Sequence, residues 1–183
     1  MDVITTNTLG LSEAEVALLE ATLAQAHEDN RQILPPNSES LLIDESSSRF
    51  SSAIWFREIG KQIVTLAGLG GIGSYVAFLL GRLKVSQIII YDDDTVDETN
   101  LSGQMFSRRD IGRFKTITVC QMLRDYSNYY NIISNNERFT CGSPATDIMI
   151  CGFDNMSARE TFYKGWRDYV TGKPEAERGN CLF

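Results

Sequence analysis

A glycine-rich string at residues 68–73 is the first part of the sequence whose composition suggests chemistry. Gly68, Gly70 and Gly73 fit the spacing G-x-G-x-x-G, and the string follows an apolar run that ends at Ala67. Positions without side chains let a phosphate approach backbone N–H groups at the start of the next helix. The string therefore predicts a mononucleotide or dinucleotide site, with ATP, nicotinamide and flavin all compatible. The alternative is a tight strand-to-helix turn that binds no ligand.

Three carboxylates follow the next apolar run. Asp92, Asp93 and Asp94 come about 19 residues after Gly73, where an acid can accept hydrogen bonds from ribose hydroxyls, and we predict Asp92 for that contact. Adjacent acids repel a bare phosphate chain, so bound phosphates would need cations or a metal nearby. Basic residues follow within one short stretch: Arg108, Arg109, Arg113 and Lys115. The alternative is that the acids only cap a solvated loop.

A further acid, Asp154, follows the apolar run at residues 147–151 together with Asn155. The carboxyl ends of parallel strands meet at one edge of a sheet, so Asp154 is expected beside the glycine-rich string. A carboxylate there can hold Mg²⁺ against the phosphates. The alternative is that Asp154 or Asn155 caps the helix that begins at Met156.

The surrounding pattern alternates between strand and helix, which is typical of a parallel sheet. We therefore predict an α/β fold, a Rossmann-like parallel sheet flanked by helices, over residues 49–183. Residues 1–48 are predicted to form a helical appendage and linker, because residues 11–30 show helical apolar spacing and Pro35-Pro36 follows them. The predicted strands are residues 62–67, 87–91, 132–139 and 147–151, and the predicted helices are residues 73–83, 112–126 and 156–169.

Composition excludes several classes of protein. The formal net charge of −7 has the wrong sign for general nucleic-acid binding. No apolar run is long enough for a membrane helix and the N-terminus does not resemble a secretory signal, so a cytoplasmic location and no membrane partner are expected. A hydrolase triad lacks its base, because the one histidine, His27, lies in a polar helical stretch. The four scattered cysteines predict neither a zinc site nor a disulfide.

Taken together, these motifs resemble the adenylation domain of the ThiF/MoeB/HesA and ubiquitin-activating enzyme superfamily. The resemblance covers residues 49–159 and rests on several separated motifs in the order of that family. They are residues 68–73, the segment Tyr91-Asp92-Asp93-Asp94-Thr95-Val96, the pair Asn100-Leu101, Gly112, Lys115, and Asp154-Asn155 with Arg159.

The resemblance implies a fold that binds ATP with Mg²⁺ and adenylates the C-terminal carboxylate of a ubiquitin-like or sulfur-carrier protein that ends in Gly-Gly. By the same resemblance, Gly71 lies against the nucleotide, Lys115 approaches the phosphates, and Asp154 binds the metal with Asn155 beside it. Arg49 reaches the phosphates bound by a partner subunit, which implies a homodimer. Four further residues are implied to line the nucleotide pocket: Thr99, Asn100, Leu101 and Ser102.

The chain departs from the family pattern in two places. Gly103 stands where the family has an arginine that grips the phosphates, and the sequence stops at Phe183, before the C-terminal part of the family domain is complete. The final residues resemble the start of another strand, so the chain is expected to be truncated there. Two alternatives therefore stay open beside adenylation: a non-catalytic ATP-binding module of the same fold, and an NAD- or FAD-dependent oxidoreductase.

Overall fold

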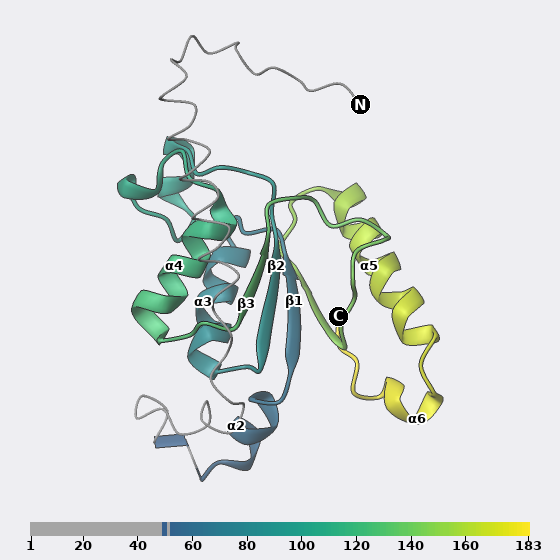
Figure 1. Cartoon of the computed structure of the whole chain (residues 1–183). Coiled ribbons are helices and arrows are strands. Elements are labelled where there is room, and N and C mark those ends of the chain that lie inside the picture. The colour runs from purple at the N-terminus through teal and green to yellow at the C-terminus, as the bar shows by residue number, and fades with distance from the viewer. Residues whose placement is uncertain (1–48, 51) are drawn as a thin grey trace, which may run out of the picture. The chain divides into compact units, whose positions relative to one another are not determined.

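The computed structural model describes residues 49–50 and 52–183. Four parallel strands form one sheet in the order β3-β2-β1-β4, as Figure 1 shows. The strands are β1 (Ile63–Ala67), β2 (Gln87–Tyr91), β3 (Ile132–Asn135) and β4 (Ile148–Cys151). The predicted helix at residues 11–30, with His27, lies outside the described residues.

Helices cover both faces of the sheet. In Figure 1, α3 (Gly73–Leu83) and α4 (Lys115–Ser127) lie on one face, and α5 (Met156–Thr171) lies on the other. The predicted fold class, a parallel sheet flanked by helices, is therefore confirmed. The sequence reading missed the short elements, which are α2 (Ile54–Ile59), α6 (Glu175–Arg178) and the 3-10 helices η3 (Glu98–Ser102) and η4 (Arg108–Asp110).

Side chains alternate between the two faces along each strand, as in any pleated sheet. Val64 and Leu66 of β1 point into the core beneath α3 and α4. Ala67 of β1 belongs to the second core, beneath α5, where Met149 and Phe162 are fully buried. Both faces of β1 are therefore buried, which accounts for the nearly continuous apolar run in its sequence.

Two element boundaries differ from the prediction by more than two residues. Helix α4 begins at Lys115 and not at residue 112, because Gly112 has a φ of +84°, which is not a helical conformation. Strand β3 ends at Asn135 and not at residue 139. The chain leaves the sheet because Asn136 accepts a hydrogen bond from Thr116 of α4, while Phe139 turns into the second core.

The last residues extend the sheet beyond β4. The backbone N–H of Leu182 donates to the carbonyl of Asp147 over 2.8 Å, and the N–H of Met149 donates to the carbonyl of Leu182 over 3.0 Å. Leu182 thus makes a single parallel bridge with Ile148, which agrees with the expected start of another strand. Phe183 packs on Phe162, with 5.8 Å between ring centroids.

All four cysteines lie among the described residues, and all four are free. Cys120 is buried, and burial raises the pKa of its thiol to about 11. Within the described part of the chain, no helix is both long and apolar enough to cross a bilayer.

Candidate functional site

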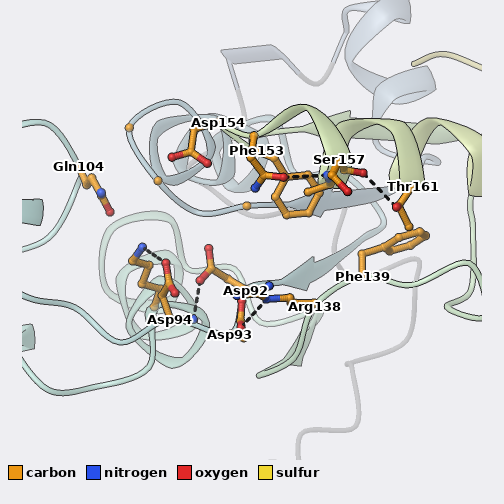
Figure 2. A pocket seen from close by; sticks show the side chains of 17 residues that line it. Asp92, Asp93, Asp94, Gln104, Arg138, Phe139, Phe153, Asp154, Ser157 and Thr161 are labelled. Atoms are coloured by element: carbon orange, nitrogen blue, oxygen red, sulfur yellow. Dashed lines mark hydrogen bonds and ion pairs between the residues drawn. The ribbon is translucent and has the colours of Figure 1, made fainter.

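A pocket of about 500 Å³ opens at the carboxyl ends of the strands, and Figure 2 shows the side chains around it. Its walls come from segments far apart in sequence: the glycine-rich turn after β1, the acidic loop after β2, Gln104, the start of α4, the loops after β3 and β4, and the first turns of α5. The predicted residues on these walls are Gly68, Gly70, Gly71, Asp92, Lys115, Asp154 and Asn155.

The glycine-rich turn is shaped by contact between three backbones. Gly68 has a φ of +86°, which favours glycine, and its carbonyl oxygen lies where a Cβ atom on Gly73 or on Gly152 would fall. Gly73 is accordingly a packing position beneath the turn and does not line the pocket. Gly152, which sequence reasoning missed, is the matching position after β4; the signal was a glycine directly after a strand.

Asp92 uses its carboxylate to hold two loops together. Its Oδ2 accepts a 2.6 Å hydrogen bond from the N–H of Leu69, and its Oδ1 accepts a 2.9 Å bond from the N–H of Asp94. The side chain is buried, and this burial raises its pKa despite the two hydrogen bonds. Asp92 therefore ties the glycine-rich turn to the acidic loop while it lines the pocket.

Lys115 is a buried cation at the first residue of α4. Its Nζ lies 2.8 Å from Oδ2 of Asp94, and its backbone N–H donates to the carbonyl of Asp94 over 3.0 Å. The lysine side chain is 7% exposed, whereas that of Asp94 is 61% exposed. The ammonium group is thus fixed at the pocket wall by a partner that faces solvent.

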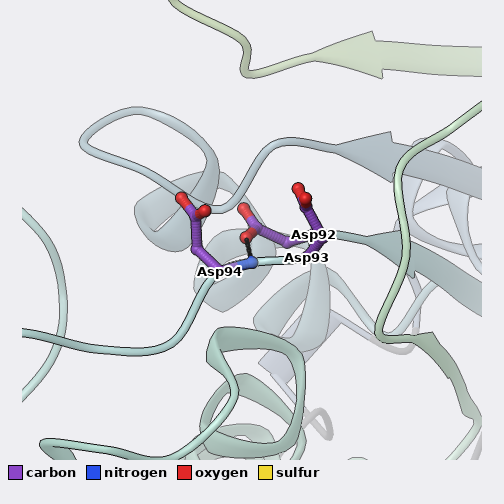
Figure 3. A group of neighbouring side chains, drawn as sticks. All are labelled: Asp92, Asp93 and Asp94. Atoms are coloured by element: carbon purple, nitrogen blue, oxygen red, sulfur yellow. Dashed lines mark hydrogen bonds between the residues drawn. The ribbon is translucent and has the colours of Figure 1, made fainter.

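The neighbouring acid, Asp93, has a cationic partner of its own. Nε of Arg138 lies 2.8 Å from Oδ2 of Asp93, and both side chains reach solvent. The three acids form a compact group, seen in Figure 3, whose closest carboxylate oxygens lie within 4.8 Å of one another. Oxygen ligands at such spacing suit a hard divalent cation.

The charges around the pocket do not balance. Four carboxylates line it, Asp92, Asp93, Asp94 and Asp154, against the two cations of Lys115 and Arg138, each already paired with an acid. A phosphate chain would add further negative charge, so its binding requires an added cation. Asp154, which is exposed at the pocket, and the group at residues 92–94 are the described acids placed to hold one.

Asn155 caps helix α5, which is one of the alternatives that the sequence analysis left open. Its Oδ1 accepts a 2.8 Å hydrogen bond from the N–H of Ala158, which caps α5. Asp154, the preceding residue, makes no such cap among the described residues and keeps its carboxylate at the pocket. Asn155 therefore caps α5 while it also lines the pocket, whereas Asp154 lines the pocket without capping the helix.

The segment at residues 99–102 contacts the pocket wall through Asn100. Asn100 is buried and forms a capping box with Asp97, with a 3.2 Å bond from the N–H of Asp97 to its side chain and a 3.1 Å bond in return. Its carbonyl also accepts a 3.0 Å bond from the N–H of Gln104, which does line the pocket. The four residues predicted for nucleotide contact, Thr99, Asn100, Leu101 and Ser102, are not among the lining residues. Their predicted role stays a prediction.

Two other predicted positions can now be placed. Arg49 is exposed and does not line this chain's own pocket, so its predicted contact with a partner subunit's nucleotide stays a prediction. Gly103 has nothing within 4 Å of the position that a Cβ atom would take, so the missing arginine leaves open space.

Sequence reasoning missed one end of the pocket entirely. Its residues come from the loop after β3, the loop after β4 and α5, and none belongs to a recognised motif: Arg138, Phe139, Phe153, Ser157 and Thr161. Figure 2 places Phe139 and Thr161 at the end opposite Gln104. The only signal for them was their position after strands that end at the same sheet edge.

The sequence matches the ThiF family over residues 48–164, which is more than half of the chain. Ubiquitin-like modifier-activating enzyme 5 of Culex quinquefasciatus is 28% identical over 121 residues, and that of Dictyostelium discoideum is 30% identical over 122 residues. Each match covers 57% of this chain but only 30% and 32% of those relatives. The chain thus spans about a third of the length of the curated relatives it matches.

Solved structures share the fold at lower identity. Escherichia coli TcdA, a tRNA N6-threonylcarbamoyladenosine dehydratase solved in complex with ATP, superposes with a TM-score of 0.62 at 17% identity, covering 75% of this chain and 59% of that one. E. coli MccB, solved with MccA-N7isoASN, gives a TM-score of 0.60 at 20% identity, covering 72% of this chain and 42% of MccB. At these identities the likeness shows a common fold.

Proposed function

The chain belongs to the ThiF family, and from this membership we propose that its pocket binds ATP with Mg²⁺ and activates a carboxylate by adenylation. The proposed acceptor is the C-terminal carboxylate of a ubiquitin-like or sulfur-carrier protein ending in Gly-Gly. Its support is the similarity to ubiquitin-like modifier-activating enzyme 5. The family match gives no support to the oxidoreductase alternative.

One observation carries the proposal. Asp92, Lys115 and Asp154, which stand far apart in sequence, line a single pocket together with the glycine-rich turn. The turn offers backbone N–H groups to phosphate, and Lys115 adds a buried positive charge. Asp92 stands at the end of β2, where a carboxylate can accept from ribose hydroxyls. This set provides for the sugar, the phosphates and a cation in one place.

The proposed chemistry needs no histidine. The acceptor carboxylate is ionised near pH 7, and one of its oxygens attacks the α-phosphorus of ATP. A C–O–P linkage forms, and the bond between the α-phosphorus and the oxygen that bridges the α- and β-phosphates breaks. That oxygen leaves with its electron pair on pyrophosphate, and no proton is transferred in the step. The protein must then hold the reactants in line and offset phosphate charge. Mg²⁺ held by Asp154 would supply part of that offset.

Arg49 has a proposed role across a subunit boundary. We propose that the chain forms a homodimer in which each Arg49 side chain reaches the phosphates bound by the other copy. Arg49 is exposed and absent from its own pocket, which supports an action elsewhere. Because carboxylates outnumber cations in the pocket, a guanidinium group from the other copy would offset part of the phosphate charge.

A second candidate function is a non-catalytic ATP-binding module. Gly103 supplies no cation, and both pocket cations, Lys115 and Arg138, are engaged by acids. Loss of one positioned transition-state contact commonly lowers a rate by about 10² to 10³. A chain with this pocket could therefore bind ATP firmly and turn it over very slowly.

Pyrophosphate exchange separates the two candidates. The purified chain would be incubated with Mg²⁺-ATP, labelled pyrophosphate and a panel of ubiquitin-like proteins that end in Gly-Gly. Asp154→Ala and Lys115→Ala test the pocket, and Asp168→Ala, which removes an exposed acid from α5 away from the pocket, is the matched control. ATP binding would be measured on each variant by calorimetry.

Adenylation predicts exchange that both pocket variants reduce by about 10² or more while the control retains it. ATP binding without exchange for any acceptor would favour the non-catalytic module. Failure of the wild-type chain to bind ATP in the presence of Mg²⁺ would contradict both functions.

A further inference from the structure

We propose that Arg138 is a specificity-determining residue that packs the face of its guanidinium group on the nucleobase, at the Phe139 end of the pocket. This inference rests on the proposed function, because it assigns an orientation to the nucleotide in the same pocket. No sequence motif points to Arg138; its place in the pocket wall does.

The two ends of the pocket differ in chemistry. The end near Gln104 holds the ammonium group of Lys115, which is paired with Asp94, and the glycine-rich turn. The ammonium group and the backbone N–H groups of the turn suit phosphates. The opposite end, seen in Figure 2, holds the rings of Phe139 and Phe153. An aromatic surface suits a planar base but does not suit a charged phosphate group.

Asp92 lies between these ends. In Figure 2 its carboxylate stands between Asp94 on one side and Arg138 on the other. If the ribose contacts Asp92 and the phosphates extend toward Lys115, the base must extend toward Arg138 and Phe139. The spatial order of the walls therefore matches the order of groups in a nucleotide.

The aromatic end is rigid. Phe139 is buried and packs edge to face on Tyr91 and Phe162, with ring centroids 5.3 and 4.7 Å apart. Phe153 also packs edge to face on Phe162, at 5.8 Å. These packed rings form a fixed surface. A flexible side chain on the other side could hold a base against it.

Arg138 has the properties of that flexible side chain. Its side chain is 80% exposed and is held by one hydrogen bond, from Nε to Asp93. Within the described residues its two terminal nitrogens make no hydrogen bond or ion pair, so they can turn toward a ligand. A planar guanidinium group stacks on aromatic rings, which an ammonium group cannot do.

The competing explanation is that Arg138 offsets phosphate charge and so replaces the family arginine whose position is occupied here by Gly103. The two roles predict different effects of removing the Arg138 side chain on binding affinity. A stacking role affects the base, whereas a charge role affects any polyphosphate. Calorimetric titration of the full chain with Mg²⁺-ATP and with Mg²⁺-tripolyphosphate separates them.

Three variants and one control complete the design. Arg138→Ala removes the side chain, Arg138→Lys keeps the charge, and Arg138→Gln keeps a planar group without charge. Arg167→Ala is the control, because Arg167 is also exposed and also pairs with an aspartate, but does not line the pocket. Melting temperature, measured for each, checks that the exposed substitutions leave the fold intact.

We expect Arg138→Ala and Arg138→Lys to weaken Mg²⁺-ATP binding about tenfold and to leave tripolyphosphate binding within about twofold of wild type. Arg138→Gln should retain part of the ATP affinity, and Arg167→Ala all of it. Equal weakening of ATP and tripolyphosphate, full affinity in Arg138→Lys, or unchanged ATP affinity in Arg138→Ala would overturn the inference. A wild-type chain that binds tripolyphosphate and ATP equally would overturn the base site but leave the phosphate site standing; binding of neither would overturn the proposed function itself.

Discussion

The N–H of Leu69 donates a 2.6 Å hydrogen bond to Oδ2 of Asp92, and this bond joins the glycine-rich turn directly to the acidic loop. The other oxygen of the same carboxylate accepts from the N–H of Asp94, whose side chain in turn holds Lys115. The pocket wall is thus connected from β1 to α4 through one buried acid.

Removal of that acid should loosen the fold as well as the pocket. Asp92→Ala leaves the N–H groups of Leu69 and Asp94 without their acceptors, and we expect it to lower the free energy of unfolding by about 1–3 kcal/mol. Asp92→Asn keeps one acceptor oxygen and should lose less. Urea titration of both variants measures this order. A fully stable Asp92→Ala protein would mean that the two hydrogen bonds contribute nothing.

A methyl group on Gly152 should be poorly tolerated. Its Cβ would fall on the carbonyl oxygen of Gly68, and neither backbone can move without opening the turn or the sheet edge. We expect Gly152→Ala to cost about 3 kcal/mol or more, at or beyond the upper end of ordinary overpacking. Gly142→Ala is the control, because its Cβ would meet only the Thr140 hydroxyl at 3.8 Å. Comparable stability of the two variants would show that the close contact can relax.

An arginine at position 103 should strengthen the phosphate site. Gly103 has a φ of −144°, which any residue adopts, and open space for a side chain. In a pocket with an excess of acids, Gly103→Arg should raise pyrophosphate exchange by about 10-fold to 100-fold, with Gly103→Ala as the neutral control. Exchange assays at fixed Mg²⁺-ATP test it. No gain in the arginine variant would place the phosphates away from residue 103.

Stability should depend on pH through Asp147. Hydrogen bonds from Lys173 and then from Tyr169 hold the pKa of this carboxyl below its ordinary value of 3.8. A lowered folded-state pKa stabilises the fold above 3.8, and that stabilisation is lost as the pH falls through the lowered value. We expect Asp147→Asn to reduce the melting temperature by about 2 °C at pH 7, since the pair is partly exposed.

The same measurement at lower pH gives the check. As the pH falls below 3.8 and through the lowered pKa of Asp147, the wild-type carboxyl becomes protonated, so the melting temperatures of Asp147→Asn and wild type should converge. Asp168→Ala, which removes an exposed acid paired with a neighbouring arginine, should show no comparable convergence. A difference between Asp147→Asn and wild type that grows in acid would contradict the assignment.

The pocket end that no motif predicted shows where sequence reasoning stops. Phe139 was predicted at the end of a strand over residues 132–139, but the chain leaves the sheet after Asn135. The cause is a contact between Asn136 and Thr116 of α4, 20 residues away in sequence. Periodicity within a segment carries no information about such a contact, so Arg138 and Phe139 could not be assigned to the pocket.

Periodicity and motif order in the sequence were enough to determine the alternation of strands and helices, the glycine-rich turn and the resemblance to the ThiF family. They also predicted Asp92 and Asp154 at one sheet edge, because parallel strands present their carboxyl ends together, and the resemblance implied that Lys115 lies near the same site. Only the tertiary structure decided that Asp92 holds backbone amides, that Asp94 holds Lys115, and that Gly152 closes on Gly68. Each of these contacts depends on the relative placement of at least two packed elements, which local sequence patterns do not specify.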